Sequence, residues 1–239
     1  MKIGRPGTAP LTGVVPGFFR VRVFRYARAA RCIPIGEKGG RSMRKKGTAL
    51  LVLLALLLAG CGEKVQSRAE EWQQRYAQMQ GYEALVDVAV PREDETLHYA
   101  LSIERSGDTV RAAVMEPEAL AGVTATLTGD ALTLEYDGMA LDAGTLSPRV
   151  SALSCVPLVL DGFSRAYLDS VGSETLDGQE TLRADFSMTL GGEPLGGTVW
   201  FEDGGAPMYA EVCENGKIIA AAEFTNFVFG DILPPSTQN

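Results

Sequence analysis

Cys61 is the residue of this chain whose surroundings point most directly to a chemical reaction. A cluster of cations at residues 44–46 precedes an apolar run at residues 49–59, in which seven of eleven residues are leucine, and Ala59 and Gly60 then lead to the cysteine. This order is typical of a secretory signal, and the run is shorter than the roughly 20 residues that span a membrane. A buried leucine-rich helix is the alternative, but the cations before it and the polar residues after it disfavour that interpretation.

The segment Leu58-Ala59-Gly60-Cys61 resembles the bacterial lipobox, because leucine, small residues and cysteine follow one another behind a signal. The resemblance implies that the Cys61 thiol is acylated, with palmitate-like chains, and that the signal at residues 43–60 is cleaved before it. Two or three acyl chains form a stable anchor, whereas one is marginal. We therefore expect an exported lipoprotein held at the outer face of a cell membrane, or at an outer membrane where the cell has one.

Residues 1–42 precede this signal and are rich in arginine, glycine and proline. A signal normally begins a protein. We expect translation to start at Met43, with residues 1–42 belonging to an over-extended gene model; a long positively charged leader is the alternative.

Cys155 and Cys213 are the two cysteines that follow Cys61. An even pair in an exported protein predicts a disulfide between them. The alternative is two buried reduced thiols, since Cys155 lies in an apolar run. Neither belongs to a Cys-x-x-Cys pair, so redox catalysis is not indicated.

Catalytic and metal-binding signatures are absent from the sequence. It contains no Gly-x-Ser-x-Gly, phosphate-loop or His-Glu-x-x-His motif, and His98 is the single histidine. The acids at residues 93–95 lack the spacing of a calcium loop. We expect no enzymatic activity, no metal and no cofactor; a hydrolase would need a cleft that gathers His98 and acids.

Charge divides the chain in two. Residues 1–60 hold 12 basic residues and one acid, and the remaining residues hold 10 basic and 29 acidic ones, for a net charge of −8. A strongly acidic body repels phosphate backbones, which excludes nucleic acid as a partner.

A helix and a long series of strands are predicted after Cys61. Apolar residues recur at helical spacing up to Met79, so residues 61–80 should hold the lipid anchor and an N-terminal helix. From Tyr82 the period changes to two, with Asp-Gly and Asn-Gly turns between strands. We expect an α+β domain over residues 81–230, dominated by roughly ten antiparallel strands, and a polar tail over residues 231–239.

One apolar helix is predicted between two runs of strands. Ser147 and Pro148 suit its first positions, and apolar residues follow at helical spacing as far as Tyr167. Pro157 and Gly162 are expected to kink or split it.

This order of elements resembles the LolA/LolB-like group of lipoprotein-sorting and lipid-carrier proteins, and residues 123–138 have the texture of that group. The resemblance implies a strongly curved antiparallel sheet, a half-open barrel, with helices as a lid over an apolar cavity. It also implies binding of a lipid or acyl chain in envelope biogenesis or in lipid or lipoprotein transport.

Ten apolar residues are the candidates for the wall of that cavity: Leu134, Tyr136, Val156, Leu158, Leu160, Phe163, Phe186, Met188, Val199 and Phe201. The same residues would equally form a filled core, because core and cavity wall have the same composition. The chain would then be an interaction or sensor module, with an envelope protein as its partner. A cavity separates the two hypotheses.

Overall fold

The computed structural model describes residues 64–129, 131–145 and 150–230. The predicted signal, Cys61, Ser147, Pro148 and the polar tail lie outside the described residues. Among the helices of the described part, none has the length and apolar character needed to cross a membrane.

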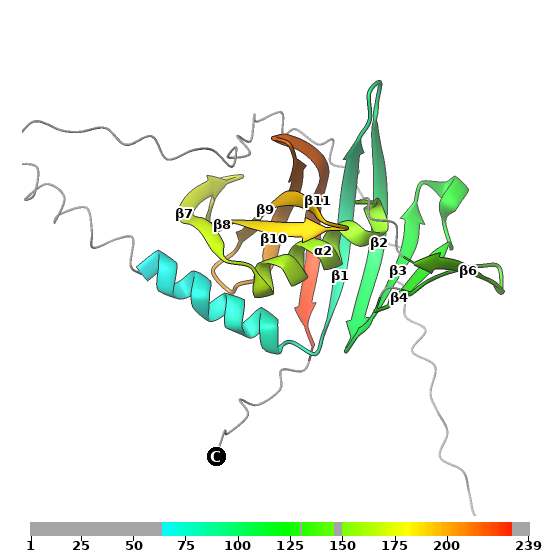
Figure 1. Ribbon diagram of the computed structural model, residues 1–239, viewed down its shortest axis with the longest axis horizontal. Helices are drawn as coiled ribbons and strands as arrows, with labels where there is room; N and C mark the ends of the chain where they lie inside the picture. Colours follow the sequence, from blue (N-terminus) through cyan, green and yellow to red (C-terminus); the bar gives the residue numbers. More distant parts are fainter. Residues whose placement is uncertain (1–63, 130, 146–149, 231–239) are drawn as a thin grey trace, which may run out of the picture. The chain divides into compact units, whose positions relative to one another are not determined.

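One curved antiparallel sheet forms most of the domain (Figure 1). Its eleven strands are β1 (Gly81–Pro91), β2 (Thr96–Ser106), β3 (Thr109–Glu116), β4 (Thr124–Thr128), β5 (Ala131–Tyr136), β6 (Met139–Thr145), β7 (Leu168–Leu176), β8 (Gln179–Leu190), β9 (Glu193–Phe201), β10 (Pro207–Glu214) and β11 (Lys217–Phe229). Their order across the sheet is β6-β5-β4-β3-β2-β1-β11-β10-β9-β8-β7, so β1 and β11 pair at the centre and β6 and β7 are the edges. The predicted α+β class, with a strongly curved antiparallel sheet, is confirmed.

Short turns connect most strands and set their register. Asp137 and Gly138 have φ values of 49° and 75° and join β5 to β6. A type I′ hairpin turn requires positive φ at both of its central positions, which is why the Asp-Gly pair predicts it.

Strand β7 is not among the strands that the sequence predicts. Most of its side chains are exposed or half-buried, because it pairs only with β8 at the edge of the sheet. An edge strand with little burial carries a weak alternation of apolar and polar residues, so its sequence does not identify it.

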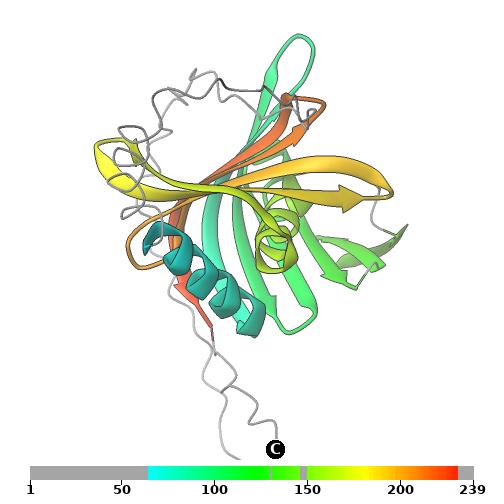
Figure 2. The same ribbon diagram turned by 60° about the vertical axis from the view of Figure 1, so that its left-hand side comes forward.

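In the part of the chain that the structure describes, two helices pack on the concave side of the sheet. One spans residues 64–78, and the other is α2 (Ala152–Arg165), capped by Ser151, whose side chain accepts a hydrogen bond from the Ser154 amide. A short 3₁₀ turn, η1 (Glu118–Leu120), joins β3 to β4. Figure 2 shows α2 inside the concavity, with the helix of residues 64–78, in cyan, beside it.

The predicted break in the central helix is not found, because α2 runs without interruption through Pro157 and Gly162. Pro157 lies in the second turn, where its missing N–H removes a single helical bond. Gly162 is required for packing: a Cβ there would lie 2.8 Å from Cε2 of Phe186.

An aromatic cluster joins both helices to the sheet. The Tyr76 ring contacts Phe163 of α2 at 5.4 Å, Phe201 of β9 at 5.6 Å and Phe229 of β11 at 5.6 Å between ring centroids. Trp72 lies 5.5 Å from Phe201. Such aromatic pairs stabilise a core beyond their buried area, and here they hold the helix of residues 64–78 against α2.

Candidate functional site

The predicted cavity residues divide between two places in the structure. Six of them are at most 1% exposed and pack together between α2 and strands β8 and β9: Val156, Leu160, Phe163, Phe186, Val199 and Phe201. Leu158 and Met188 are partly buried against this core. Phe163 and Phe201 are 4.6 Å apart between ring centroids, which leaves no room for a ligand between those two rings.

Leu134 and Tyr136 lie elsewhere, on β5. We name strands β4, β5 and β6 the wing, since they form the end of the sheet farthest from β7. Tyr136 is 53% exposed, in contrast to the six core residues. The structure therefore does not bring the ten predicted residues into one site.

The strand register places the wing on the same face as the core. Ala112 of β3, which is buried in the core, is opposite Ala125 of β4; Ala125 is opposite Leu134 of β5, and Leu134 is opposite Leu141 of β6. Directly opposed residues of antiparallel strands point to one side of the sheet. The concave apolar face thus continues from the core to the edge strand.

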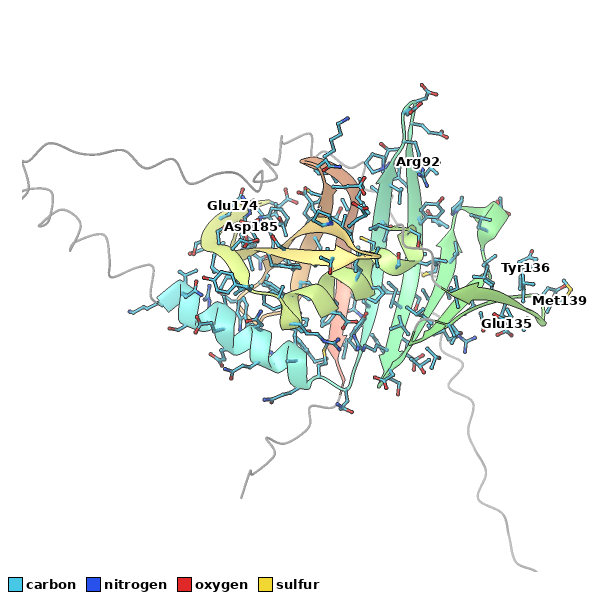
Figure 3. All side chains as sticks on the ribbon, in the orientation of Figure 1. Arg92, Glu135, Tyr136, Met139, Glu174 and Asp185 are labelled. Atoms are coloured by element: carbon cyan, nitrogen blue, oxygen red, sulfur yellow. The ribbon has the colours of Figure 1, made fainter. Side chains whose placement is uncertain are left out.

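The outer part of this face is exposed. Met139 pairs with Tyr136 across the hairpin and is 69% exposed, and Leu141 is 64% exposed. Figure 3 shows Tyr136 and Met139 at the free end of the wing. Helix α2 packs mainly against β1 and β8–β11, so it covers the other half of the concave face.

Sequence reasoning misses Met139 and Leu141. The Asp-Gly turn at residues 137–138 is recognisable in the sequence, and a tight two-residue hairpin places Met139 opposite Tyr136. Applying that register to the predicted residues Tyr136 and Leu134 would have identified their partners, Met139 and Leu141.

Two surface pockets found among the described residues lie outside the predicted cavity. One, of about 270 Å³, is lined by residues at the start of β1 and the ends of β2 and β11, including Tyr82 and Arg105. The other, of about 280 Å³, is lined by β7 residues together with Arg183 and Asp185 of β8. Neither is lined by any of the ten predicted cavity residues.

The pocket beside β7 belongs to a polar network on the convex face. Asp185 Oδ1 accepts hydrogen bonds from Arg183 Nη2 at 2.8 Å and from the Thr198 hydroxyl at 2.8 Å. The Trp200 indole N–H donates to Glu174 at 3.0 Å, and Figure 3 shows Glu174 and Asp185 near one another. These bonds pair the network's polar atoms with one another, so it serves the structure of the sheet.

Glu211 of β10 is the buried acid of that face, with 5% exposure. Burial raises its pKa to about 7, against the lowering effects of the Tyr209 hydrogen bond and the Arg183 charge. A carboxyl group with this pKa changes its charge near neutral pH.

His98 lies on β2, and its side chain is exposed. Burial and Glu116 raise the pKa of nearby Asp87, while His98 lowers it, so these three groups are near one another. Neither pocket is lined by them. Within the described ranges, no group of three His, Cys, Asp or Glu side chains is arranged to hold a metal ion.

The predicted Cys155–Cys213 bridge is not formed. Cys155 is a free and fully buried thiol, and burial raises its pKa to about 12. Cys213 is disulfide-bonded, but not to Cys155. Val212 faces the core, so the next residue, Cys213, points to the convex side; the sheet separates it from Cys155 on α2.

The helix of residues 64–78 is attached directly to α2. Gln73 Nε2 donates hydrogen bonds to the carbonyl oxygens of Phe163 at 2.8 Å and Ala166 at 2.7 Å. These are carbonyls at the end of α2, which have no partner within the helix. The Tyr76 hydroxyl donates to Gly205 O at 2.9 Å, between β9 and β10. The helix that follows Cys61 in the chain is therefore bonded to both α2 and the sheet.

No protein-family model and no curated protein matches this chain. Similar solved structures include an uncharacterised conserved protein from Thermus thermophilus, with a TM-score of 0.43 and 10% identity, covering 72% of this chain and 96% of that one. A LolA superfamily protein from Nitrosomonas europaea has a TM-score of 0.37 and 11% identity, covering 71% of this chain and 94% of that one. The lipoprotein LppX of Mycobacterium tuberculosis has a TM-score of 0.39 and 17% identity, covering 71% and 96%. The likeness is one of fold.

Proposed function

We propose that this protein is an exported lipoprotein that binds an acyl chain or another apolar ligand on the concave face of the wing. The observation that supports this proposal is the exposure of Tyr136, Met139 and Leu141 on the face that carries the core. The action is non-covalent: the ligand's apolar surface is removed from water, with no bond made or broken.

The physical reason is the hydrophobic effect. Burying apolar surface gains about 25 cal/mol per Å², and each CH₂ group of an acyl chain gains about 0.8 kcal/mol. A ligand lying over Leu134 and Leu141 covers protein surface and is itself covered. Contiguous exposed apolar surface of this kind is characteristic of ligand or partner sites.

The ligand lies beside α2 in this proposal, and not beneath it. The six core residues pack together between α2 and strands β8 and β9, so a ligand there would have to displace the helix. The wing needs no such displacement, since its outer side chains already face solvent. Leu134 and Tyr136 are the predicted residues that keep a role in ligand contact.

The binding test uses two variants of β6, each of which introduces one glutamate, on opposite faces of the sheet. Leu141→Glu introduces a charge on the concave face, and Ala140→Glu introduces the same charge at the neighbouring exposed residue on the convex face. We expect the first variant to lose binding of the fluorescent apolar probe N-phenyl-1-naphthylamine and the second to retain it. Equal binding by both variants would contradict the proposed site.

The membrane anchor is proposed at Cys61, and a labelling experiment tests it. Cells expressing the protein are fed an alkyne analogue of palmitate. We expect the label on the wild-type protein in the membrane fraction, and no label on Cys61→Ser. A labelled Cys61→Ser protein would place the acyl chains on another residue.

A protein-interaction module is the second candidate function, and the filled core favours it. Native mass spectrometry of the detergent-free protein separates the two. A bound mass that denaturation releases, and that contains acyl chains, supports ligand binding. An apo mass that persists after incubation with cell-envelope lipids supports the interaction module.

A further inference from the structure

One row of side chains crosses the concave face and changes from polar to apolar along its length. Directly opposed pairs link Tyr82 of β1 to Arg105 of β2, Arg105 to Val110 of β3, Val110 to Leu127 of β4, and Leu127 to Leu132 of β5. The row thus begins at two polar side chains and ends on the apolar wing. Adjacent strands are about 4.8 Å apart, so three intervals from Arg105 to Leu132 span about 14 Å. This is the scale of a medium-length acyl chain.

The Tyr82 hydroxyl is the group in this row that lacks a partner. The side chain is 1% exposed and its ring stacks on Phe227, with centroids 5.4 Å apart. Its oxygen has no hydrogen-bond partner among the described residues. Buried hydroxyls in native proteins are nearly always paired. Burial raises the pKa of Tyr82 far above its ordinary value, so the hydroxyl keeps its proton and is a donor.

The charges near this hydroxyl restrict what it can bind. Arg105 Nη1 forms an ion pair with Asp161 of α2, and both charges act on the Tyr82 hydroxyl. Tyr82 and Arg105 line the 270 Å³ pocket together with Glu83 and Glu104. Arg105, the cation among these residues, is already paired with Asp161. A carboxylate or phosphate group therefore finds no uncompensated positive charge here, whereas a neutral oxygen acceptor needs none.

We propose that Tyr82 donates a hydrogen bond to the neutral head group of an acyl ester, whose chain passes the buried Val110 and extends over Leu127 and Leu132 of the wing. The inference rests on the proposed function, because the wing must hold the chain. It adds an orientation and a head-group class: the ester carbonyl lies at the start of β1, and the end of the chain points to β5 and β6.

The test measures displacement of N-phenyl-1-naphthylamine from the purified protein by monolauroylglycerol, a neutral ester, and by laurate, an anion of equal chain length. The wild-type protein should bind the ester more tightly than laurate. Tyr82→Phe should weaken ester binding about three- to ten-fold, the effect of one hydrogen bond. Tyr167→Phe, at an 86% exposed tyrosine, is the control and should match the wild type.

The outcomes separate this inference from the proposed function. If the wild-type protein binds neither probe nor ester, the proposed function fails and this inference with it. If it binds both but laurate competes as well as the ester, or Tyr82→Phe binds the ester as the wild type does, the head-group inference alone is overturned. The comparison of ester with laurate uses only the wild-type protein, so it remains decisive even if Tyr82→Phe does not fold.

Discussion

Gly162 of α2 lies against the ring of Phe186 on β8, so closely that a Cβ at residue 162 would be 2.8 Å from Cε2 of that ring. The same added atom would be 2.9 Å from Sδ of Met188. The same edge of the ring also lies against Gly197 of β9, where a Cβ would be 2.4 Å from Cε2. The Phe186 ring therefore packs against two glycines, and the missing side chain at residue 162 lets the helix approach the concave face.

We predict that Gly162→Ala destabilises the protein. Overpacking a core costs about 1–3 kcal/mol, whereas alanine in a helix gains about 0.5–1 kcal/mol over glycine. The overpacking cost exceeds the helical gain, so the free energy of unfolding should fall by about 1 kcal/mol in urea denaturation.

The control is Gly172→Ala on β7, where an added Cβ meets no atom within 4 Å. Its free energy of unfolding should stay within about 0.5 kcal/mol of the wild type. A Gly162→Ala protein as stable as this control would show that Phe186 and Met188 move aside at little cost.

Gly162 also illustrates how far the sequence predicts this fold. Sequence periodicity and turn residues predict the helices, nearly all strands and the antiparallel class, because these features depend on local spacing. The structural role of Gly162 depends on its contacts with Phe186 and Met188, which belong to a strand later in the sequence. Sequence alone therefore indicates a helix breaker where the structure has a close contact.

The candidate site is predicted only in part for a related reason. Leu134 and Phe186 have the same apolar character in the sequence, yet one lies on the wing and the other in the packed core. Which of them faces solvent depends on where a 14-residue helix lies over an eleven-stranded sheet. Tyr82 is missed because an unpaired hydroxyl is a property of its surroundings and leaves no pattern in the sequence.

Gln73 is predicted to hold the end of α2 in place. Gln73→Ala removes two hydrogen bonds to the carbonyls of Phe163 and Ala166, each worth about 0.5–1.5 kcal/mol. We expect lower stability and faster amide hydrogen exchange in the last turn of α2. Gln66→Ala is the matched control, since Gln66 bonds to Glu70 of its own helix at an exposed position. Unchanged exchange in the Gln73→Ala protein would mean that aromatic packing alone fixes the end of α2.

Cys155 is predicted to be unreactive in the folded protein and reactive once it unfolds. The thiolate is the nucleophile in alkylation, and burial raises the pKa of this thiol to about 12. Iodoacetamide should leave the peptide that contains Cys155 unmodified under native conditions. The same peptide should be alkylated in urea without reductant. A peptide that requires reduction first would restore the Cys155–Cys213 bridge.

Glu211 is predicted to make stability depend on pH near neutrality. Its pKa is about 7 in the folded protein, above the ordinary value of 4.5. Between these values the folded state binds a proton that the unfolded state has released. The stabilisation from this group is therefore complete below pH 4.5, falls as the pH rises through 7, and stays lost above it. The pKa difference corresponds to about 3 kcal/mol.

In the wild-type protein the Tyr209 hydroxyl forms a hydrogen bond with the Glu211 side chain. Glu211→Gln removes the titration of this side chain but keeps an oxygen that can accept that bond. We expect the variant to be more stable than the wild type at about pH 8, by about 1–3 kcal/mol, and the difference to disappear near about pH 5. Glu214→Gln changes an exposed carboxyl at the end of the same strand, so its curve of unfolding free energy against pH should follow that of the wild type. If Glu211→Gln and Glu214→Gln give the same curve between about pH 5 and about pH 8, the Glu211 carboxyl is charged in the fold throughout that range, and the Arg183 charge outweighs its burial.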